Sequence, residues 1–216
     1  MTEIRKCQVL IVGAGPGGYV AGIRSGQLGL DTIVVEGDKS GGTCLIRGCI
    51  PSKAMIHAAE RFESLSKHSS ENGHMGISIS SEPVLDMPSL ISWKDSIVDR
   101  LNKGVESLLK GAGVDLVKGW ATFTGPKRCT VKTSEGNIEI EAENVILANG
   151  SVPIELPFMK YGDGVISSRE ALDIDEKLEH LVVVGGGYIG LELGIVHRML
   201  GAEVTIVEAM DSVLPI

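Results

Sequence analysis

Residues 11–36 read IVGAGPGGYVAGIRSGQLGLDTIVVE, and residues 183–208 read VVGGGYIGLELGIVHRMLGAEVTIVE. Aligned at an offset of 172 positions, the two stretches share ten identical residues out of 26. Each predicts a buried strand, a glycine-rich turn, a helix, a second strand and a glutamate at its end. A strand that leads through such a turn into a helix begins a parallel β-α-β unit. The chain is therefore predicted to be α/β and to open two Rossmann-like dinucleotide-binding domains.

The glycines of each turn follow the Gly-x-Gly-x-x-Gly spacing of dinucleotide-binding proteins. The first permits a tight turn, the second lets a diphosphate approach the backbone, and the third lets the helix pack closely on the strand. The helix N-terminus then offers free N–H groups to the diphosphate, and the glutamate can accept ribose hydroxyls. Because a glutamate repels the 2′-phosphate of NADP, the second turn is predicted to bind NAD. The residues concerned are Gly13, Gly15, Gly18 and Glu36, and then Gly185, Gly187, Gly190 and Glu208.

The composition is that of a folded protein with an excess of glycine. Of the 216 residues, 43% are hydrophobic, 22% are charged and 28 are glycine. The net charge of −8 argues against a nucleic-acid partner. No apolar run is long enough for a membrane span, and the N-terminal sequence lacks a secretory signal pattern. We therefore expect a cytoplasmic protein that binds neither nucleic acid nor a membrane, and we assign no metal site.

The sequence between the two repeats predicts helices followed by short strands. Helices are expected at 51–63 and 88–111, with a serine-rich loop at 64–82 between them. A linker is expected at 152–164, so we place a first domain at residues 1–151 and the start of a second at 152–216. The strand candidates are 114–118, 120–124, 129–133, 137–141 and 144–148.

Two of the four cysteines lie in one segment, residues 41–53, which reads GGTCLIRGCIPSK. On a regular helix Cys44 and Cys49 would lie about 7.5 Å apart along the axis, whereas a disulfide needs Cα atoms roughly 4.4–6.8 Å apart. A bridge thus requires a distorted turn, which Gly48 and Pro51 can supply. The alternative interpretation is two unpaired buried thiols. The position of the pair, one short loop after Glu36 of the first dinucleotide-binding unit, favours redox chemistry and a disulfide in the oxidised protein.

Three further residues have simpler interpretations. Cys7 and Cys129 have no comparable context and are predicted to pack within strands. Lys53 follows Cys49 by four residues and would lie on the same helix face one turn on. Lys53 could equally be an ordinary surface lysine.

With the cysteine segment and the two glycine turns, the chain resembles the pyridine nucleotide–disulfide oxidoreductase family, and within it most closely the bacterial dihydrolipoamide dehydrogenases. The resemblance covers essentially all 216 residues. It includes the step Ile50-Pro51-Ser52-Lys53, where glutathione reductases usually carry a different residue in place of the serine. Other segments that carry it are SWKDSIVDRL, ELPF, VISSREAL and VVGGGYIGLELG.

The resemblance implies a flavoprotein that reoxidises dihydrolipoamide on a lipoyl domain of a 2-oxo acid dehydrogenase complex, works as a homodimer, and passes electrons through FAD to NAD. In the family the first cysteine, here Cys44, exchanges disulfide with the substrate, and the second, Cys49, passes electrons to the flavin. The resemblance makes residues 1–151 the FAD-binding domain, with a small antiparallel sheet inserted and its returning C-terminal piece absent, and makes 152–216 the N-terminal part of the NAD-binding domain. The implied FAD site is Gly13, Gly15, Pro16, Gly17, Gly18, Glu36, Gly42, Thr43, Cys44, Lys53, Ala121, Asn149, Gly150 and Ser151. The implied NAD site is Gly185, Gly187, Tyr188, Ile189, Gly190, Glu192 and Glu208.

Two features depart from the family pattern. Asn149 stands where the family usually has threonine, which removes a β-branched side chain beside the expected flavin site. Family members are also more than twice as long, so we expect the dimerisation domain with its His–Glu base to be missing and this chain alone to turn over little substrate. The five histidines do not match that base: they are His57, His68, His74, His180 and His197.

Two other functions remain open from the sequence. One is a glutathione or mercuric reductase of the same superfamily, although Glu208 and the Pro-Ser-Lys step weigh against glutathione. The other is a truncated nucleotide-binding module without catalysis. Bound FAD would distinguish the enzymes from such a remnant.

Overall fold

The computed structural model describes residues 4–69 and 74–214. Two compact units can be distinguished: unit 1 comprises residues 1–46 and 98–152, and unit 2 comprises residues 47–97 and 153–216. The segment 47–97, which the sequence places with the first domain, thus groups with the second unit by its contacts. Within the described ranges, no helix is long and apolar enough to cross a lipid bilayer.

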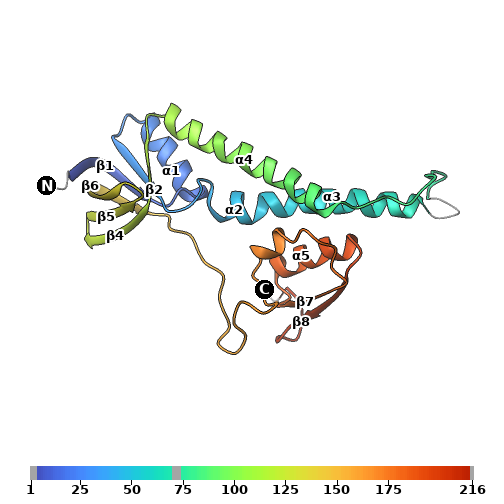
Figure 1. Cartoon of the computed structure of the whole chain (residues 1–216). Helices are drawn as coiled ribbons and strands as arrows, with labels where there is room; N and C mark the ends of the chain where they lie inside the picture. The colour runs from blue at the N-terminus through green and yellow to red at the C-terminus, as the bar shows by residue number, and fades with distance from the viewer. Residues whose placement is uncertain (1–3, 70–73, 215–216) are drawn as a thin grey trace. The chain divides into compact units, whose positions relative to one another are not determined.

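Unit 1 is built on a six-stranded sheet with the order β3-β2-β1-β6-β5-β4 (Figure 1). β1 lies parallel to β2 on one side and to β6 on the other, and β3 lies parallel to β2. β6 also pairs antiparallel with β5, which pairs antiparallel with β4. The strands are β1 (Ile4–Val12), β2 (Thr32–Glu36), β3 (Asp115–Lys118), β4 (Trp120–Gly125), β5 (Arg128–Thr133) and β6 (Gly136–Leu147).

One strand prediction was wrong in a simple way. The sequence predicted separate strands at 137–141 and 144–148, whereas β6 runs unbroken through both. Its residues from Glu139 to Leu147 pair with β1 while its first residues pair with β5. The expected small antiparallel sheet is therefore continuous with the parallel sheet through β6.

Apolar side chains of these strands form the core of unit 1. Leu10 and Ile11 in β1 and Val34 and Val35 in β2 are at most 1% exposed, as expected for parallel strands covered on both faces. The prediction that Cys7 and Cys129 pack within strands is confirmed, and burial raises the pKa of Cys7 to about 11 and raises that of Cys129. The cluster contains Cys7, Leu10, Ile33, Val35, Val117, Cys129, Val131, Ile140 and Ala142.

Two helices pack closely on the sheet of unit 1. α1 (Pro16–Gln27) connects β1 to β2, and a Cβ added at Gly22 would lie 2.9 Å from Val34 and 3.0 Å from Leu109 of α4 (Met87–Gly111). The predicted helix 88–111 is thus confirmed. α2 (Gly42–Arg47) follows the loop after β2.

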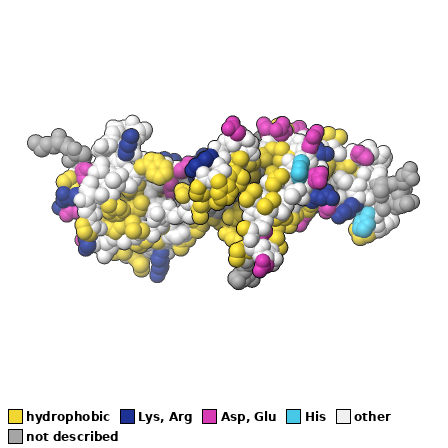
Figure 2. All heavy atoms as spheres, turned by 90° about the horizontal axis from the view of Figure 1, so that it is seen from below, with side chains coloured by type: hydrophobic (Ala, Val, Ile, Leu, Met, Phe, Trp, Pro, Cys, Tyr) yellow, Lys and Arg dark blue, Asp and Glu magenta, His cyan; other side chains and the backbone are white. Residues whose placement is uncertain are grey.

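Unit 2 contains a second parallel strand pair, β7–β8, with its connecting helix α5, as predicted (Figure 1). α5 packs against α3, and the core between them includes Met55, Ala59, Leu193 and Val196. Figure 2 shows hydrophobic side chains at the surface of the protein. In β7, Val182 and Val184 are each 52% exposed. The elements are α3 (Cys49–His68), the 3-10 helix η1 (Glu170–Leu172), β7 (His180–Val184), α5 (Tyr188–Met199) and β8 (Glu203–Val207).

α3 is longer than the predicted helix at both ends. It begins after Gly48, two residues before Pro51, and continues to His68 through residues that were expected to form a loop. The hydroxyl of Ser66 donates to the carbonyl of Phe62, 3.0 Å away, so this serine bonds back to its own helix instead of ending it.

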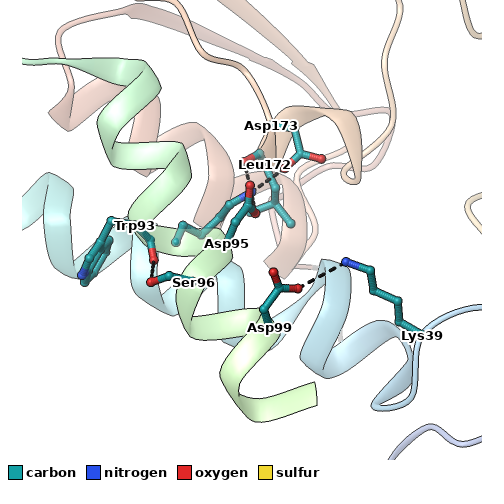
Figure 3. Close-up of polar contacts among 8 residues, drawn as sticks. Lys39, Trp93, Asp95, Ser96, Asp99, Leu172 and Asp173 are labelled. Carbon is teal, nitrogen blue, oxygen red and sulfur yellow. Dashed lines mark hydrogen bonds and ion pairs between the residues drawn. The ribbon is translucent and has the colours of Figure 1, made fainter. Parts of the chain in front are cut away.

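A buried lysine joins the first half of α4 to η1 within unit 2. Lys94 is 1% exposed, and its ammonium donates to the Leu172 carbonyl at 2.9 Å. It also forms ion pairs with Asp95, at 3.0 Å, and with Asp173 (Figure 3). Because an unpaired buried cation is costly, these partners fix the segment that precedes β7.

Candidate functional site: two glycine turns and a cysteine segment

The backbone of the first glycine turn is closely packed by the end of β6 and by the start of α1. Gly13 has a φ of +100°, and a Cβ there would lie 2.2 Å from the carbonyl oxygen of Ala148. A Cβ at Gly18 would lie 1.7 Å from the carbonyl oxygen of Gly13. The glycines at these two positions are therefore required by the turn and by helix packing, as the sequence predicted.

The middle glycine of the turn has a different role. A Cβ at Gly15 would meet only the Cα of Gly42, at 3.6 Å, which is an ordinary contact. Gly15 is the N-cap of α1, with no side-chain cap and no acidic residue in the first turn, and Pro16 and Gly17 are exposed. The N-terminus of α1 thus has the character of an anion site, with uncapped N–H groups and the positive end of the helix dipole.

The carboxylate of Glu36 is hydrogen-bonded to the backbone of the first glycine turn. Its carboxylate accepts hydrogen bonds from the N–H of Ala14, at 2.7 Å, and from the N–H of Asp38, at 2.9 Å. The sequence predicted ribose hydroxyls as its partners and missed these two amides. Since each carboxylate oxygen has a second lone pair, both roles are chemically compatible.

The loop after Glu36 lies against the first turn. The N–H of Gly41 donates to the carbonyl of Ala14 at 2.7 Å, and a Cβ at Gly42 would lie 2.5 Å from the Cα of Gly15. Thr43 follows at the exposed start of α2. The structure therefore brings the predicted residues Gly42 and Thr43 to the first glycine turn.

The end of β6 supplies a further side of this site. The N–H of Ala148 donates to the carbonyl of Val12, and the exposed Asn149, Gly150 and Ser151 follow directly. Across the loop, a Cβ at Gly37 would meet the ring of Trp120 at 2.6 Å, which brings the start of β4 and its next residue, Ala121, near the end of β2.

The second glycine turn repeats the first with a shift of 172 residues. Gly185 has a φ of +105°, and Gly187 is the N-cap of α5, again without a side-chain cap. The carboxylate of Glu208 accepts from the N–H of Gly186 at 2.7 Å and from that of Met210 at 2.8 Å. These hydrogen bonds, with that from Met210 the stronger influence, lower the pKa of Glu208.

The two predicted redox cysteines lie on either side of a helix break. Cys44 is half-buried in α2, Cys49 is exposed at the first position of α3, and Gly48 between them has φ −144° and ψ −113°. The backbone therefore leaves helical geometry at Gly48, between the two cysteines. No disulfide joins Cys44 to Cys49 in the structure, so their pairing stays a prediction.

Within unit 2, an ion pair joins the N-terminal parts of α3 and α5. The ammonium of Lys53 lies 2.6 and 2.8 Å from the two carboxylate oxygens of Glu192. The Ser52 hydroxyl lies 3.2 Å from the same carboxylate and 3.3 Å from the Cys49 carbonyl. The sequence assigned Lys53 and Glu192 to different cofactors and missed both their pairing and Ser52.

Three of the histidines have local partners. The ring of His197 is buried, which lowers its pKa, and its Nε2 lies 3.3 Å from the Ala171 carbonyl oxygen. Nδ1 of His68 lies 2.5 Å from the Ser64 carbonyl oxygen, and Nε2 of His180 lies 2.9 Å from the Thr205 hydroxyl.

Known proteins resemble the chain over nearly its whole length. The sequence profile of the family described as "Pyridine nucleotide-disulphide oxidoreductase" matches residues 7–216. The dihydrolipoyl dehydrogenase of Pseudomonas aeruginosa is 51% identical over 216 residues, and that of Halobacterium salinarum is 48% identical over 212. The match covers 100% and 96% of this chain but 46% and 43% of those proteins, so the chain spans about half the length of the relatives it matches.

Solved structures agree with this family match. LpdA from Mycobacterium tuberculosis superimposes with a TM-score of 0.83 at 26% identity, over 97% of this chain and 46% of its own. The HOCl-induced flavoprotein disulfide reductase RclA from Escherichia coli gives a TM-score of 0.80 at 28% identity, over 96% of this chain and 43% of its own.

Proposed function

Because the chain belongs to the pyridine nucleotide–disulphide oxidoreductase family, we propose that the protein is a dihydrolipoyl dehydrogenase that oxidises the dithiol of dihydrolipoamide. The observation that carries this proposal is the position of Cys44. It lies two residues beyond Gly42, which packs on the first glycine turn. A redox cysteine directly beside a dinucleotide turn is what a dithiol-to-flavin enzyme requires.

The residues of unit 1 fit FAD. The uncapped N-terminus of α1 at Gly15 suits the diphosphate, and the exposed segment Asn149–Ser151 lies next to Gly13. The predicted set of FAD contacts also includes Pro16, Gly17, Gly18, Glu36, Gly42, Thr43, Cys44 and Ala121 of unit 1, together with Lys53, which belongs to unit 2. When bound, FAD supplies a two-electron acceptor between the enzyme dithiol and the pyridine nucleotide.

The residues of unit 2 fit NAD. The N-terminus of α5 at Gly187 has no side-chain cap. The carboxylate of Glu208, at the same turn, can accept a hydrogen bond from a ribose hydroxyl and would repel a 2′-phosphate. Tyr188 and Ile189, in the first turn of α5, are exposed and complete the predicted contacts together with Gly185, Gly190 and Glu192.

The two cysteines carry out the exchange with substrate. A substrate thiolate attacks the sulfur of Cys44 in the Cys44–Cys49 disulfide, which forms a mixed disulfide and releases Cys49 as a thiolate. The second substrate thiolate attacks the substrate sulfur of that mixed disulfide, so lipoamide leaves oxidised and Cys44 leaves as a thiolate. The enzyme has then gained two electrons as a dithiol.

The partners follow from this activity. We propose that the dithiol is presented on a lipoyl domain of a 2-oxo acid dehydrogenase complex, that the protein works as a homodimer, and that it acts in the cytoplasm. A reducing cytoplasm suits a chain in which Cys7 and Cys129 are buried strand residues and only the Cys44–Cys49 pair cycles.

Thiol chemistry tests the proposal most directly. In the intact protein, Cys44→Ser and Cys49→Ser should each lower NAD⁺ reduction by dihydrolipoamide roughly 10³-fold or more. Cys129→Ser, which alters a buried strand cysteine, is the matched control and should retain activity. A protein purified without FAD absorbance, or one whose activity survives Cys44→Ser, would exclude this function.

Disulfide formation is tested separately. Thiol titration of the air-oxidised, denatured protein should find two free thiols, those of Cys7 and Cys129, and four after reduction. Four free thiols before reduction would contradict the proposed Cys44–Cys49 bridge.

A further inference from the structure

A polar side chain interrupts the buried face of α4 in unit 1. Val98, Val105 and Leu109 of this face are buried. Asn102 lies on the same face, four residues after Val98 and three before Val105, where the spacing favours an apolar residue. Asn102 is half-buried, and its side-chain amide donates a hydrogen bond to the backbone carbonyl of Ser40. The asparagine therefore joins α4 to a segment some sixty residues earlier in the chain.

The carbonyl that Asn102 binds belongs to a fully buried residue. Ser40 is 0% exposed and lies in the loop between β2 and α2, residues 37–41. A buried carbonyl that loses its donor has no water to bond with, so its desolvation is left uncompensated. The hydrogen bond from Asn102 thus stabilises the loop in this position.

The same loop lies against the first glycine turn. The N–H of Gly41, the residue after Ser40, donates to the carbonyl of Ala14 at 2.7 Å. A Cβ added at Gly42 would lie 2.5 Å from the Cα of Gly15, the N-cap of α1. A shift of the loop would therefore move the backbone beside the N-terminus that is proposed to bind the diphosphate.

A second contact between this loop and α4 lies at the surface. The ammonium of Lys39 lies 3.3 Å from the carboxylate of Asp99, which precedes Asn102 by three residues (Figure 3). The two side chains are 57% and 56% exposed, and an exposed ion pair contributes little because holding it costs side-chain entropy and water screens it. Of the two contacts, the hydrogen bond from Asn102 is the one expected to fix the loop.

We propose that Asn102 is a positioning residue that holds the loop between β2 and α2 against the first glycine turn and so strengthens the binding of FAD. The inference takes FAD as the ligand from the proposed function. It extends that function by naming a residue, outside the predicted set of FAD contacts, that sets the affinity through the Ser40 carbonyl.

Asn102→Leu separates positioning from a general structural role. Leucine is similar in size and completes the apolar face of α4, which offsets the lost hydrogen bond, so the urea midpoint of the FAD-free protein should stay nearly unchanged. The Kd for FAD should rise roughly five- to fiftyfold, because the loop then spends less time in the position that binds. Titration of the intact, FAD-free protein with FAD, followed by flavin fluorescence, gives this Kd.

Hydrogen exchange provides a readout that needs no FAD. The amide of Gly41 exchanges when the loop leaves the Ala14 carbonyl, so in the FAD-free Asn102→Leu protein it should exchange roughly five- to fiftyfold faster. The paired amides of β5 and β6 should keep their rates. If the unaltered protein bound no FAD, the proposed function would fail, whereas the exchange at Gly41 would still decide the role of Asn102.

Two further variants complete the test. Asn102→Asp keeps the shape of the side chain but removes the donor, so it should weaken FAD binding at least as much as Asn102→Leu. Asp99→Asn, which removes the exposed ion pair to the same loop, is the matched control and should change both readouts less than about twofold. Unchanged FAD binding in both Asn102 variants, unchanged exchange at Gly41, faster exchange throughout β5 and β6, or an equal effect of Asp99→Asn would each overturn the proposal.

Discussion

In the first β-α-β unit the amides of Ala14 and Asp38 bind the carboxylate of Glu36, and in the second the amides of Gly186 and Met210 bind that of Glu208. Each group of the second turn lies 172 residues beyond its counterpart. The helices that follow are each 12 residues long and begin at an uncapped glycine. The local chemistry of a dinucleotide turn is therefore contained in a stretch of about 26 residues.

The two units differ in what surrounds the turn. β1 lies between β2 and β6, and a Cβ at Gly13 would meet the carbonyl of Ala148 beyond β6 at 2.2 Å. Among the strands described, β7 pairs with β8 alone, and a Cβ at Gly185 would meet no atom within 4 Å. The positive φ of the first glycine thus belongs to the turn itself, whereas its close packing comes from a strand more than a hundred residues away.

The largest expected effect tests this difference. Gly13→Ala should lower the free energy of unfolding by about 3 kcal/mol or more, because both the φ of +100° and the Ala148 backbone oppose the added methyl group. In Gly185→Ala, only the positive φ opposes the added methyl group, so the free energy of unfolding should fall by about 1 kcal/mol. Urea unfolding followed by circular dichroism gives both values.

Gly29→Ala is the matched control for the first unit, since Gly29 has a φ of +77° and nothing within 4 Å of an added Cβ. It should resemble Gly185→Ala. If Gly13→Ala and Gly29→Ala lowered the free energy of unfolding equally, the contact of Gly13 with Ala148 would contribute nothing to the stability of the turn.

A smaller effect is expected at the acid of the second turn. Glu208→Arg removes the repulsion of a 2′-phosphate, so in the intact protein the ratio of kcat/KM for NADP to that for NAD should rise roughly tenfold or more. Glu203→Arg, which makes the same charge change at the exposed start of β8, should leave the ratio unchanged. Equal use of both nucleotides by the unaltered protein would contradict the proposed role of Glu208.

The sequence predicted the two turns well because their physics is local. The glycine spacing, the apolar runs of β1 and β7 and the terminal glutamates lie within one short window of each repeat. The prediction failed for β6, whose continuity depends on pairing with β1 and β5, and for the end of α3, where serines bond back to the helix.

The candidate site was predicted residue by residue but not as a set of contacts. Lys53 and Glu192 were assigned to different cofactors because 139 residues separate them and nothing local in the sequence indicates that α3 packs on α5. The amide partners of Glu36 were also missed, as were those of Glu208 at the equivalent positions of the second turn. Contacts made by backbone N–H groups leave no residue type to recognise.

The smallest expected effect concerns acid stability in the second turn. Hydrogen bonds from the amides of Met210 and Gly186 lower the pKa of Glu208 in the folded chain, so they stabilise the fold above the unfolded-state pKa of about 4.5. This contribution is lost as the pH falls through the lowered, folded-state pKa. Glu208→Gln should therefore be less stable than the unaltered chain at pH 7, and this difference in stability should narrow below about pH 4.5. Glu203→Gln should show no such pH-dependent difference. Urea midpoints measured from pH 3 to pH 7 provide the comparison, and a gap that stayed constant across this range would mean that the carboxylate's charge is not what holds the second turn.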